Sequence, residues 1–361
     1  MEIKDKILRE DMEEIAQDAL LGDALSNSTV FITGATGLLG SQAVWALRYM
    51  NRSKGSWIRI VAMARSEDKV RNIFGDLSAA DDMTVYYGDI NEPIRYTGEV
   101  DYIIHGASAT SSKYFVSHPV ETIQTALDGT RNILEFAKNK RVKSMVYLSS
   151  LEVYGTPDAE RDLISETDYG YLDPMQVRSS YSEGKRMAEC MCAAYAAQYR
   201  ISVKAARLSQ TFGAGVDYTD GRVFAEFARC AVEQKDIVLH TPGNTVRSYC
   251  YTKDAIRAIF YILVKGEAKE AYNVTNMDTA VSIREMAETV SGLFPDRPIQ
   301  VKVEIPEDVS AFGYNPEMVI RLDASKLQRL GWKPTVGLTD MFLRMIESSF
   351  SEAEDIRNAL K

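Results

Sequence analysis

Residues 33–40, with the sequence TGATGLLG, restrict the possible folds of this chain more than any other segment. The apolar run VFI at 30–32 predicts a buried strand before them, and residues 41–47 predict a helix after them. A strand, a glycine loop and a helix in this order suit a pyrophosphate. Glycine lets the backbone approach the phosphates closely, and the helix N-terminus offers N–H groups that have no partner within the helix. The spacing, GxxGxxG, therefore predicts a bound dinucleotide.

Short apolar segments alternate with helical patterns through the first two thirds of the chain. We expect strands at 30–33, 58–64, 84–87, 102–105, 145–149 and 203–207, and helices at 41–50, 67–77, 118–139 and 180–199. This alternation predicts βαβ units around a parallel sheet. The expected fold class is α/β, a Rossmann-type doubly wound sheet whose ligand lies beyond the carboxyl ends of the strands.

The pattern changes near residue 208, where glycine and proline become frequent and the expected strands become shorter. Helices are expected there at 220–234, 253–265, 282–292 and 338–349, in a smaller C-terminal α/β lobe that closes over a substrate. The expected domains are listed as an amino-terminal helical extension at 1–27, a dinucleotide-binding domain at 28–207 and a mainly substrate-binding lobe at 208–361. A segment near 246–265 is expected to return to the first domain.

Composition limits the partners. The chain has 361 residues and a formal net charge of −9, which argues against nucleic acid or an anionic membrane as a partner. No apolar run reaches membrane-spanning length, and the charged residues 1–21 are not a secretory signal, so a cytoplasmic protein is expected. The four cysteines form no CxxC pair, and neither His105 nor His118 has a second ligand at the right spacing, so no metal site is expected.

Four residues suggest acid–base chemistry. Tyr181 and Lys185 lie four apart in an expected helix and share a face. A neighbouring ammonium favours a phenolate and lowers its pKa from about 10, so the pair can act as a general base toward a sugar or alcohol hydroxyl. Ser150 and Glu152 follow an expected strand, where this fold binds ligands. Ser150 can hydrogen-bond the same substrate oxygen, and Glu152 can be a second acid or base.

Several motifs together resemble the extended short-chain dehydrogenase/reductase family of nucleotide-sugar epimerases and dehydratases. They are TGATGLLG at 33–40, GDI at 88–90, HGAS at 105–108, SSLEVYG at 149–155 and YSEGK at 181–185. The resemblance extends from about residue 28 to about residue 348. It implies oxidation of a sugar C4 hydroxyl by a tightly held nicotinamide cofactor, with Ser150, Tyr181 and Lys185 as the triad.

The resemblance also implies binding roles. Cofactor contacts, in addition to Tyr181 and Lys185, are implied for Gly34, Thr36, Gly37, Leu38, Leu39, Gly40 and Ala107, with Asp89 and Ile90 at the adenine. Substrate contacts are implied for Ser108, Tyr114, Gln210, Arg222 and Arg247. Arg247 matches the arginine that binds the diphosphate of the nucleotide sugar, and its planar bidentate donors suit phosphate oxygens.

Within the family, the segments at 178–186, 220–223 and 246–249 are most similar to UDP-glucuronate decarboxylases. Leu151 departs from that pattern, because the decarboxylases have a small hydroxyl residue there and the 4,6-dehydratases an aspartate. Gln210 likewise replaces an asparagine. These departures leave three alternatives open: an NDP-sugar 4-epimerase or 4,6-dehydratase, an NADPH-dependent 4-ketosugar reductase, and a non-catalytic dinucleotide sensor.

The end of the second expected strand bears on the choice of cofactor. NAD enzymes usually place an acid there to bind the ribose hydroxyls, whereas this chain has AMARS at 62–66. Arg65 and Ser66 can meet a 2′-phosphate, so NADP is favoured over NAD. The resemblance also implies a homodimer, joined through the helices at 118–139 and 180–199 as a four-helix bundle.

Overall fold

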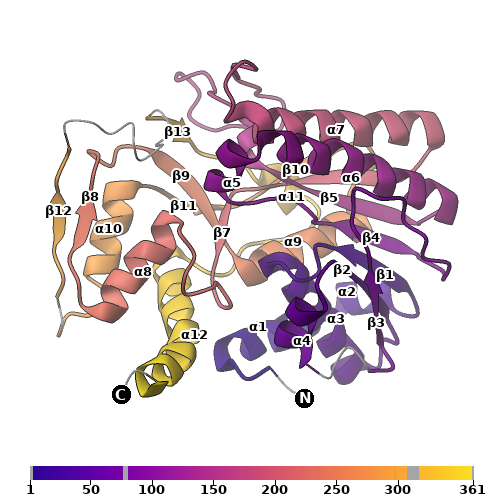
Figure 1. Ribbon diagram of the computed structural model, residues 1–361, viewed down its shortest axis with the longest axis horizontal. Helices are drawn as coiled ribbons and strands as arrows, with labels where there is room; N and C mark the ends of the chain where they lie inside the picture. Colours follow the sequence, from indigo (N-terminus) through magenta and orange to yellow (C-terminus); the bar gives the residue numbers. More distant parts are fainter. Residues whose placement is uncertain (1–2, 76–79, 297, 307–316, 360–361) are drawn as a thin grey trace.

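A seven-stranded parallel sheet organises the first part of the molecule. The computed structural model describes residues 3–75, 80–296, 298–306 and 317–359, with side chains up to residue 349 (Figure 1). Within these residues, the strands of the sheet are β1 (Thr29–Thr33), β2 (Arg59–Ala64), β3 (Met83–Tyr87), β4 (Tyr102–His105), β5 (Ser144–Ser150), β6 (Val203–Leu208) and β10 (Ala271–Val274). Their spatial order is β10-β6-β5-β4-β1-β2-β3. The expected α/β, Rossmann-type fold is confirmed.

Helices cover both faces of this sheet (Figure 1). On one face lie α1 (Lys6–Ala16), α2 (Ala19–Leu25), α3 (Leu38–Lys54) and α9 (Thr252–Lys265), and on the other α6 (Pro119–Lys140) and α7 (Ser179–Tyr199). Side chains alternate between the two faces along a strand. Val30 and Ile32 therefore pack into the hydrophobic cluster under α1, α2, α3 and α9, and Phe31 packs into the cluster under α6 and α7. Because both faces are buried, these strands are almost continuously apolar.

The chain order reverses at β1. From there β2 and β3 extend the sheet in one direction, and β4, β5, β6 and β10 extend it in the other. The glycine loop follows β1, and residues 106–111, with helix α5 (Ser112–Ser117), follow β4. Both loops therefore lie at the carboxyl ends of the strands beside the reversal, where a doubly wound sheet binds its ligand.

A second group of elements forms around Phe212 and Phe224. Its four-stranded sheet contains β7 (Gln210–Phe212), β9 (Val246–Tyr251), β11 (Asn276–Ser282) and β13 (Val319–Ile320), and β8 (Ile237–Leu239) pairs separately with β12 (Val301–Val303). Helices α8 (Val223–Glu233), α10 (Ile283–Ser291) and α12 (Leu338–Ala359) pack against these strands. The remaining helices are α4 (Glu67–Phe74) and α11 (Ser325–Gln328).

The structure differs from the expected elements in two places. The amino-terminal segment forms two helices, because the Asp18 carboxylate accepts a hydrogen bond from the N–H of Leu21 (3.3 Å) and begins α2. The expected return near 246–265 is only partly correct: α9 packs on the main sheet, but 246–251 forms β9 of the second sheet. The strand that rejoins the main sheet is β10, whose four residues are too few to show a pattern.

Candidate active site

The glycine loop is shaped by close backbone contacts. A Cβ at Gly34, where φ is +67°, would lie 2.7 Å from the Gly106 carbonyl carbon, and a Cβ at Gly40 would lie 2.1 Å from the Gly34 oxygen. Gly37 is different, since it is exposed and is the N-cap of α3 without any side chain to cap the helix. The N–H groups of the first turn of α3 are thus available to an anionic ligand.

A hydrogen-bonded loop lies beside the glycine loop. The Thr33 hydroxyl accepts hydrogen bonds from the N–H groups of Gly106 (3.2 Å) and Ala107 (3.1 Å), and it lies 2.7 Å from His105 Nδ1. Burial lowers the pKa of His105 to about 3, so its imidazole is neutral. Five expected contact residues are half-buried: Thr36, Ala107 and Ser108 on these two loops, and Leu38 and Leu39 in the first turn of α3.

The two residues expected near the adenosine end come together. Arg65 is 77% exposed, and its guanidinium lies 3.7 Å from the Asp89 carboxylate. Ile90 is buried, and its side chain lies against Gly129 of α6. The structure therefore places an acid beside Arg65 that sequence spacing alone did not locate there.

The three expected catalytic residues meet at the end of β5. The Ser150 hydroxyl lies close enough to the Tyr181 phenol to lower the pKa of that phenol. Lys185 donates a hydrogen bond to the Leu148 carbonyl (2.8 Å), and its Nζ lies 5.7 Å from the centre of the Tyr181 ring. Ser150, Tyr181 and Lys185 thus form a compact cluster at the carboxyl edge of the main sheet.

The expected lowering of the Tyr181 pKa is wrong. Burial raises the pKa of this phenol to about 12, and the nearby charge of Glu152 adds to the rise. The hydrogen bond from Ser150 and the positive charges of Arg178 and Arg222 oppose it without cancelling it. Burial outweighs these cations because a phenolate loses its hydration in the interior.

An aromatic ring covers Tyr181. Phe115 of α5 stacks on Tyr181 with ring centres 4.1 Å apart and planes 9° apart, and the Arg178 guanidinium lies 5.3 Å from the Phe115 ring centre. Tyr114, which is expected to contact substrate, is 38% exposed and stacks on His118 with ring centres 4.5 Å apart. Sequence reasoning missed Phe115, for which there was no local signal.

Arginines surround Glu152. One carboxylate oxygen of Glu152 accepts a hydrogen bond from Arg178 (3.3 Å), and the other accepts one from the Ser182 hydroxyl (3.2 Å). Arg247 is buried close enough to Glu152 for their charges to interact. Among the described residues, neither Arg178 Nη1 nor Arg247 Nη1 has a hydrogen-bond partner. Buried donors normally have one, so both point to an anionic ligand. Arg178 was missed, although it lies one helical turn before Tyr181.

Two other residues expected to contact substrate, Gln210 and Arg222, differ in their surroundings. Gln210 of β7 pairs with Tyr249 of β9, so it lies on the strand next to Arg247. Arg222 precedes α8 and forms a 2.6 Å ion pair with Asp220, while its charge still acts on Tyr181. Arg222 is therefore near the cluster but is already paired.

Leu151 does not face the catalytic cluster. It begins a 3₁₀ helix, η2 (Leu151–Tyr154), and is buried in a small apolar cluster that also contains Ile164 and Leu322. This packing anchors the segment that carries Ser150 and Glu152. The departure at position 151 thus has a structural role in this chain.

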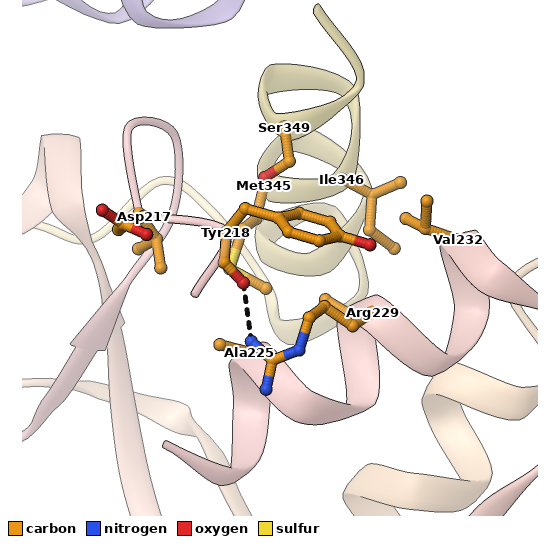
Figure 2. A pocket seen from close by; sticks show the side chains of 10 residues that line it. Asp217, Tyr218, Ala225, Arg229, Val232, Met345, Ile346 and Ser349 are labelled. Atoms are coloured by element: carbon orange, nitrogen blue, oxygen red, sulfur yellow. Dashed lines mark hydrogen bonds between the residues drawn. The ribbon is translucent and has the colours of Figure 1, made fainter. Parts of the chain in front are cut away.

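Two hollows lie away from these residues. One, between α8 and α12, is lined by Tyr218, Arg229 and Ile346 among others (Figure 2), and its volume of about 10 Å³ has room for at most one water molecule. The other, of about 450 Å³, lies beside α7 and is lined partly by Glu189 and Arg207, which are paired with each other at 2.6 Å.

Lys185 carries its charge at a cost to stability. Burial lowers its pKa from 10.5 to about 8, so between these pH values the unfolded chain binds the proton more tightly. The free energy of unfolding therefore rises with pH across this window, and the cost is fully present below pH 8. We expect Lys185→Met to abolish activity but to raise this free energy at pH 7 by about 1 kcal/mol, with the gain disappearing by pH 10.5.

Lys204 provides the matched control for this denaturation experiment. It is the second buried lysine whose pKa burial lowers to about 8, but it bonds Ser144 and Ser202 away from the catalytic cluster. Lys204→Met should be stabilised in the same pH range and stay active. Loss of stability at pH 7 in Lys185→Met would contradict the prediction.

The described residues contain neither a membrane-spanning helix nor a metal-binding cluster. None of their helices is both long and apolar enough to cross a bilayer. Within the same ranges, no group of three or more histidine, cysteine, aspartate or glutamate residues is arranged to hold a metal ion.

This chain is similar to known proteins in sequence and in fold. The model of the NAD dependent epimerase/dehydratase family matches residues 30–275. UDP-glucuronic acid decarboxylase 6 of Arabidopsis thaliana is 32% identical over 331 residues, which cover 90% of this chain and 89% of that protein. The solved structure of a dTDP-glucose 4,6-dehydratase from Streptomyces venezuelae with NAD bound superposes with a TM-score of 0.74 at 21% sequence identity. The match covers 90% of this chain and 98% of that chain. The solved structure of a UDP-N-acetylglucosamine 4-epimerase from Methanobrevibacter ruminantium has a TM-score of 0.75 at 19% sequence identity. This match covers 91% of this chain and 99% of that chain.

Proposed function

The chain belongs to the NAD-dependent epimerase/dehydratase family, and on that basis we propose that it decarboxylates UDP-glucuronate through a transient C4 ketone. One observation carries the proposal: the half-buried Arg178 and the buried Arg247 each have a buried Nη1 that is unpartnered among the described residues, around Glu152 and near Tyr181. Such a substrate has two anionic parts, a diphosphate and a carboxylate, and a guanidinium suits both. We assign Arg247 to the diphosphate and Arg178 to the carboxylate.

The loops beside β1 fit a dinucleotide. The uncapped helix start at Gly37 suits the pyrophosphate, and Arg65 with Asp89 suits the adenosine end. When bound, the dinucleotide supplies a reversible hydride acceptor for the sugar C4 carbon. The residues of the chain must then handle the proton, the carboxylate and the developing negative charge.

Tyr181 and Ser150 act on the C4 oxygen. The phenolate form of Tyr181 accepts the hydroxyl proton as C4 is oxidised, and Ser150 hydrogen-bonds the same oxygen. This form is a minor fraction at pH 7, because burial raises the pKa of the phenol to about 12. The carboxylate is β to the resulting ketone, so the C5–C6 electron pair moves toward the C4 oxygen as CO₂ leaves. Ser150 and Tyr181 stabilise the charge on that oxygen. Glu152, after taking up a proton from solvent, delivers it to C5, and Tyr181 returns its proton to oxygen when C4 is reduced.

Mass spectrometry of UDP-glucuronate incubated with the protein tests this function. NAD and NADP, in separate incubations, should each be present far below the substrate concentration, so that only an enzyme that regenerates its cofactor turns over fully. We expect complete conversion to a UDP-pentose with loss of CO₂. An unchanged mass would overturn the proposal. Turnover of a neutral sugar nucleotide would then indicate the epimerase or dehydratase, stoichiometric NADPH consumption the reductase, and cofactor binding without turnover the sensor.

Cofactor preference depends on Arg65. We propose NADP, because this exposed guanidinium can bind a 2′-phosphate, although Asp89 lies 3.7 Å away and can serve the ribose of NAD. Arg65→Ala is expected to weaken NADP binding about tenfold and leave NAD binding unchanged, since a charge-assisted hydrogen bond is lost. Calorimetric titration measures both, with Arg71→Ala as an exposed control. Tighter NAD than NADP binding by the unaltered protein would contradict the preference.

We propose a homodimer through α6 and α7, which pack side by side (Figure 1). Apolar side chains on their outer surface support this, among them Met187 (51% exposed) and Tyr199 (43%). Met187→Glu is expected to halve the mass measured by light scattering, because a buried, unpaired carboxylate is costly. Met175→Glu, altered at a more exposed methionine before α7, should stay dimeric. A monomeric unaltered protein would refute the proposal.

A further inference from the structure

The amino-terminal helices are an integral part of the protein core. Met12 and Ile15 of α1 and Leu21 and Leu25 of α2 are fully buried in the main hydrophobic cluster. Helix α1 contacts α3 and α9 of the cofactor-binding part, and also α12 of the second part. This segment therefore touches both parts of the molecule, which a helix packed on one domain alone does not.

A buried aspartate joins α1 to the second part. One carboxylate oxygen of Asp11 accepts a hydrogen bond from the Tyr251 hydroxyl (2.6 Å), and the other accepts one from Arg344 of α12 (2.8 Å). Arg344 also donates to the Tyr251 oxygen (3.1 Å), which closes a three-membered network. Asp11 and Tyr251 are completely inaccessible to solvent, and hydrogen bonds to charged groups in such surroundings are strong.

The network holds the strand that carries a substrate arginine. Tyr251 ends β9, and Arg247 lies four residues earlier on the same strand. The neighbouring strand β7 places Gln210 opposite Tyr249 and Phe212 opposite Tyr251. A β-strand is stiff over four residues, so holding Tyr251 also limits the movement of Arg247.

A second contact holds the loop after β7. Ser348 of α12 accepts a hydrogen bond from the N–H of Gly215 (3.0 Å) and donates one to Asp5, the N-cap of α1. On the other side of this loop, Gln42 of α3 donates to the Ala214 carbonyl (2.8 Å). Residues 214 and 215 are thus held between the start of α1, the start of the cofactor helix α3, and α12.

We propose that α1 is a brace that fixes β9, and with it Arg247, relative to the cofactor helix, and that Asp11 is a positioning residue for the nucleotide-sugar diphosphate. Its contacts are Asp11 with Tyr251 and Arg344, and Asp5 with Ser348. The expected effect on UDP affinity rests on the proposed function. The expected effect on the rigidity of β9 does not depend on that function.

The test is a matched pair of tyrosine variants. Tyr251→Phe removes only the hydroxyl that binds Asp11, whereas Tyr261→Phe removes the α9 hydroxyl that binds Asp18 before α2 (3.0 Å). Both variants lose one hydrogen bond to an aspartate of the amino-terminal segment. Only Tyr251, however, lies on β9. Amide hydrogen exchange of residues 246–251 and UDP affinity by calorimetry are measured on both full-length variants.

We expect Tyr251→Phe to accelerate exchange in 246–251 and to weaken UDP binding roughly three- to tenfold, because its hydroxyl is hydrogen-bonded to both Asp11 and Arg344. Tyr261→Phe should change neither. Unchanged exchange in Tyr251→Phe, or equal changes in both variants, would overturn the brace. If exchange behaves as expected but the unaltered protein does not bind UDP, the brace stands and the proposed function fails.

Discussion

Tyr181→Phe is expected to lower kcat by about 10³- to 10⁴-fold, while KM for UDP-glucuronate changes little. The substitution removes the only atom of Tyr181 that can accept the C4 proton and leaves its ring on Phe115 (4.1 Å between centres). Because this buried phenol has a pKa of about 12 and is mostly neutral at pH 7, its removal should not cost a charge interaction. Steady-state assays of product formation measure the effect.

Tyr199→Phe is the control for this variant, because Tyr199 lies on the same helix and its ring is partly exposed. Its kcat should stay within about twofold of the unaltered value, as surface substitutions are usually near-neutral. A Tyr181→Phe variant that keeps more than about a tenth of the activity would exclude this phenol as the general base.

Arg247→Met is expected to weaken UDP binding about 100-fold without destabilising the fold. Arg247 is buried and its Nη1 has no partner among the described residues, so the folded protein bears the cost of desolvating a guanidinium. Methionine removes that cost together with the donor for the diphosphate. The combination of weaker binding and an equal or higher melting temperature distinguishes a binding residue from a structural one.

Arg321→Met is the comparison for both measurements. Arg321 lies on the surface and pairs with the exposed Asp162 at 3.1 Å, so the substitution should alter neither affinity nor melting temperature appreciably. A large fall in the melting temperature of Arg247→Met would mean that this guanidinium mainly stabilises the second sheet. Unchanged UDP affinity would remove it from the diphosphate site.

Local patterns predicted the catalytic cluster well. Tyr181 and Lys185 share a helix face because they are four residues apart, and Ser150 ends a strand, so a parallel sheet brings all three to one edge. The position of the glycine loop follows for the same reason. Short-range geometry and the period of the helix suffice for this part of the site.

Contacts between distant segments could not be predicted in this way. Phe115 reaches Tyr181 from a separate short helix, and Asp11 meets Tyr251 across 240 residues of sequence. The predicted lowering of the Tyr181 pKa was also wrong, because the burial that raises this pKa depends on all the residues packed around the ring. No spacing rule contains that information.

Residue order and local backbone geometry were enough to predict the type of fold, the glycine loop and the sheet edge at which Ser150, Tyr181 and Lys185 lie together. Only the tertiary structure decided which charged groups are left without partners. Arg222 is paired with Asp220, whereas Arg178 and Arg247 retain unpartnered donors among the described residues. The reason is physical: hydrogen bonding and desolvation of a side chain depend on all its neighbours in space, and most of them come from remote parts of the chain.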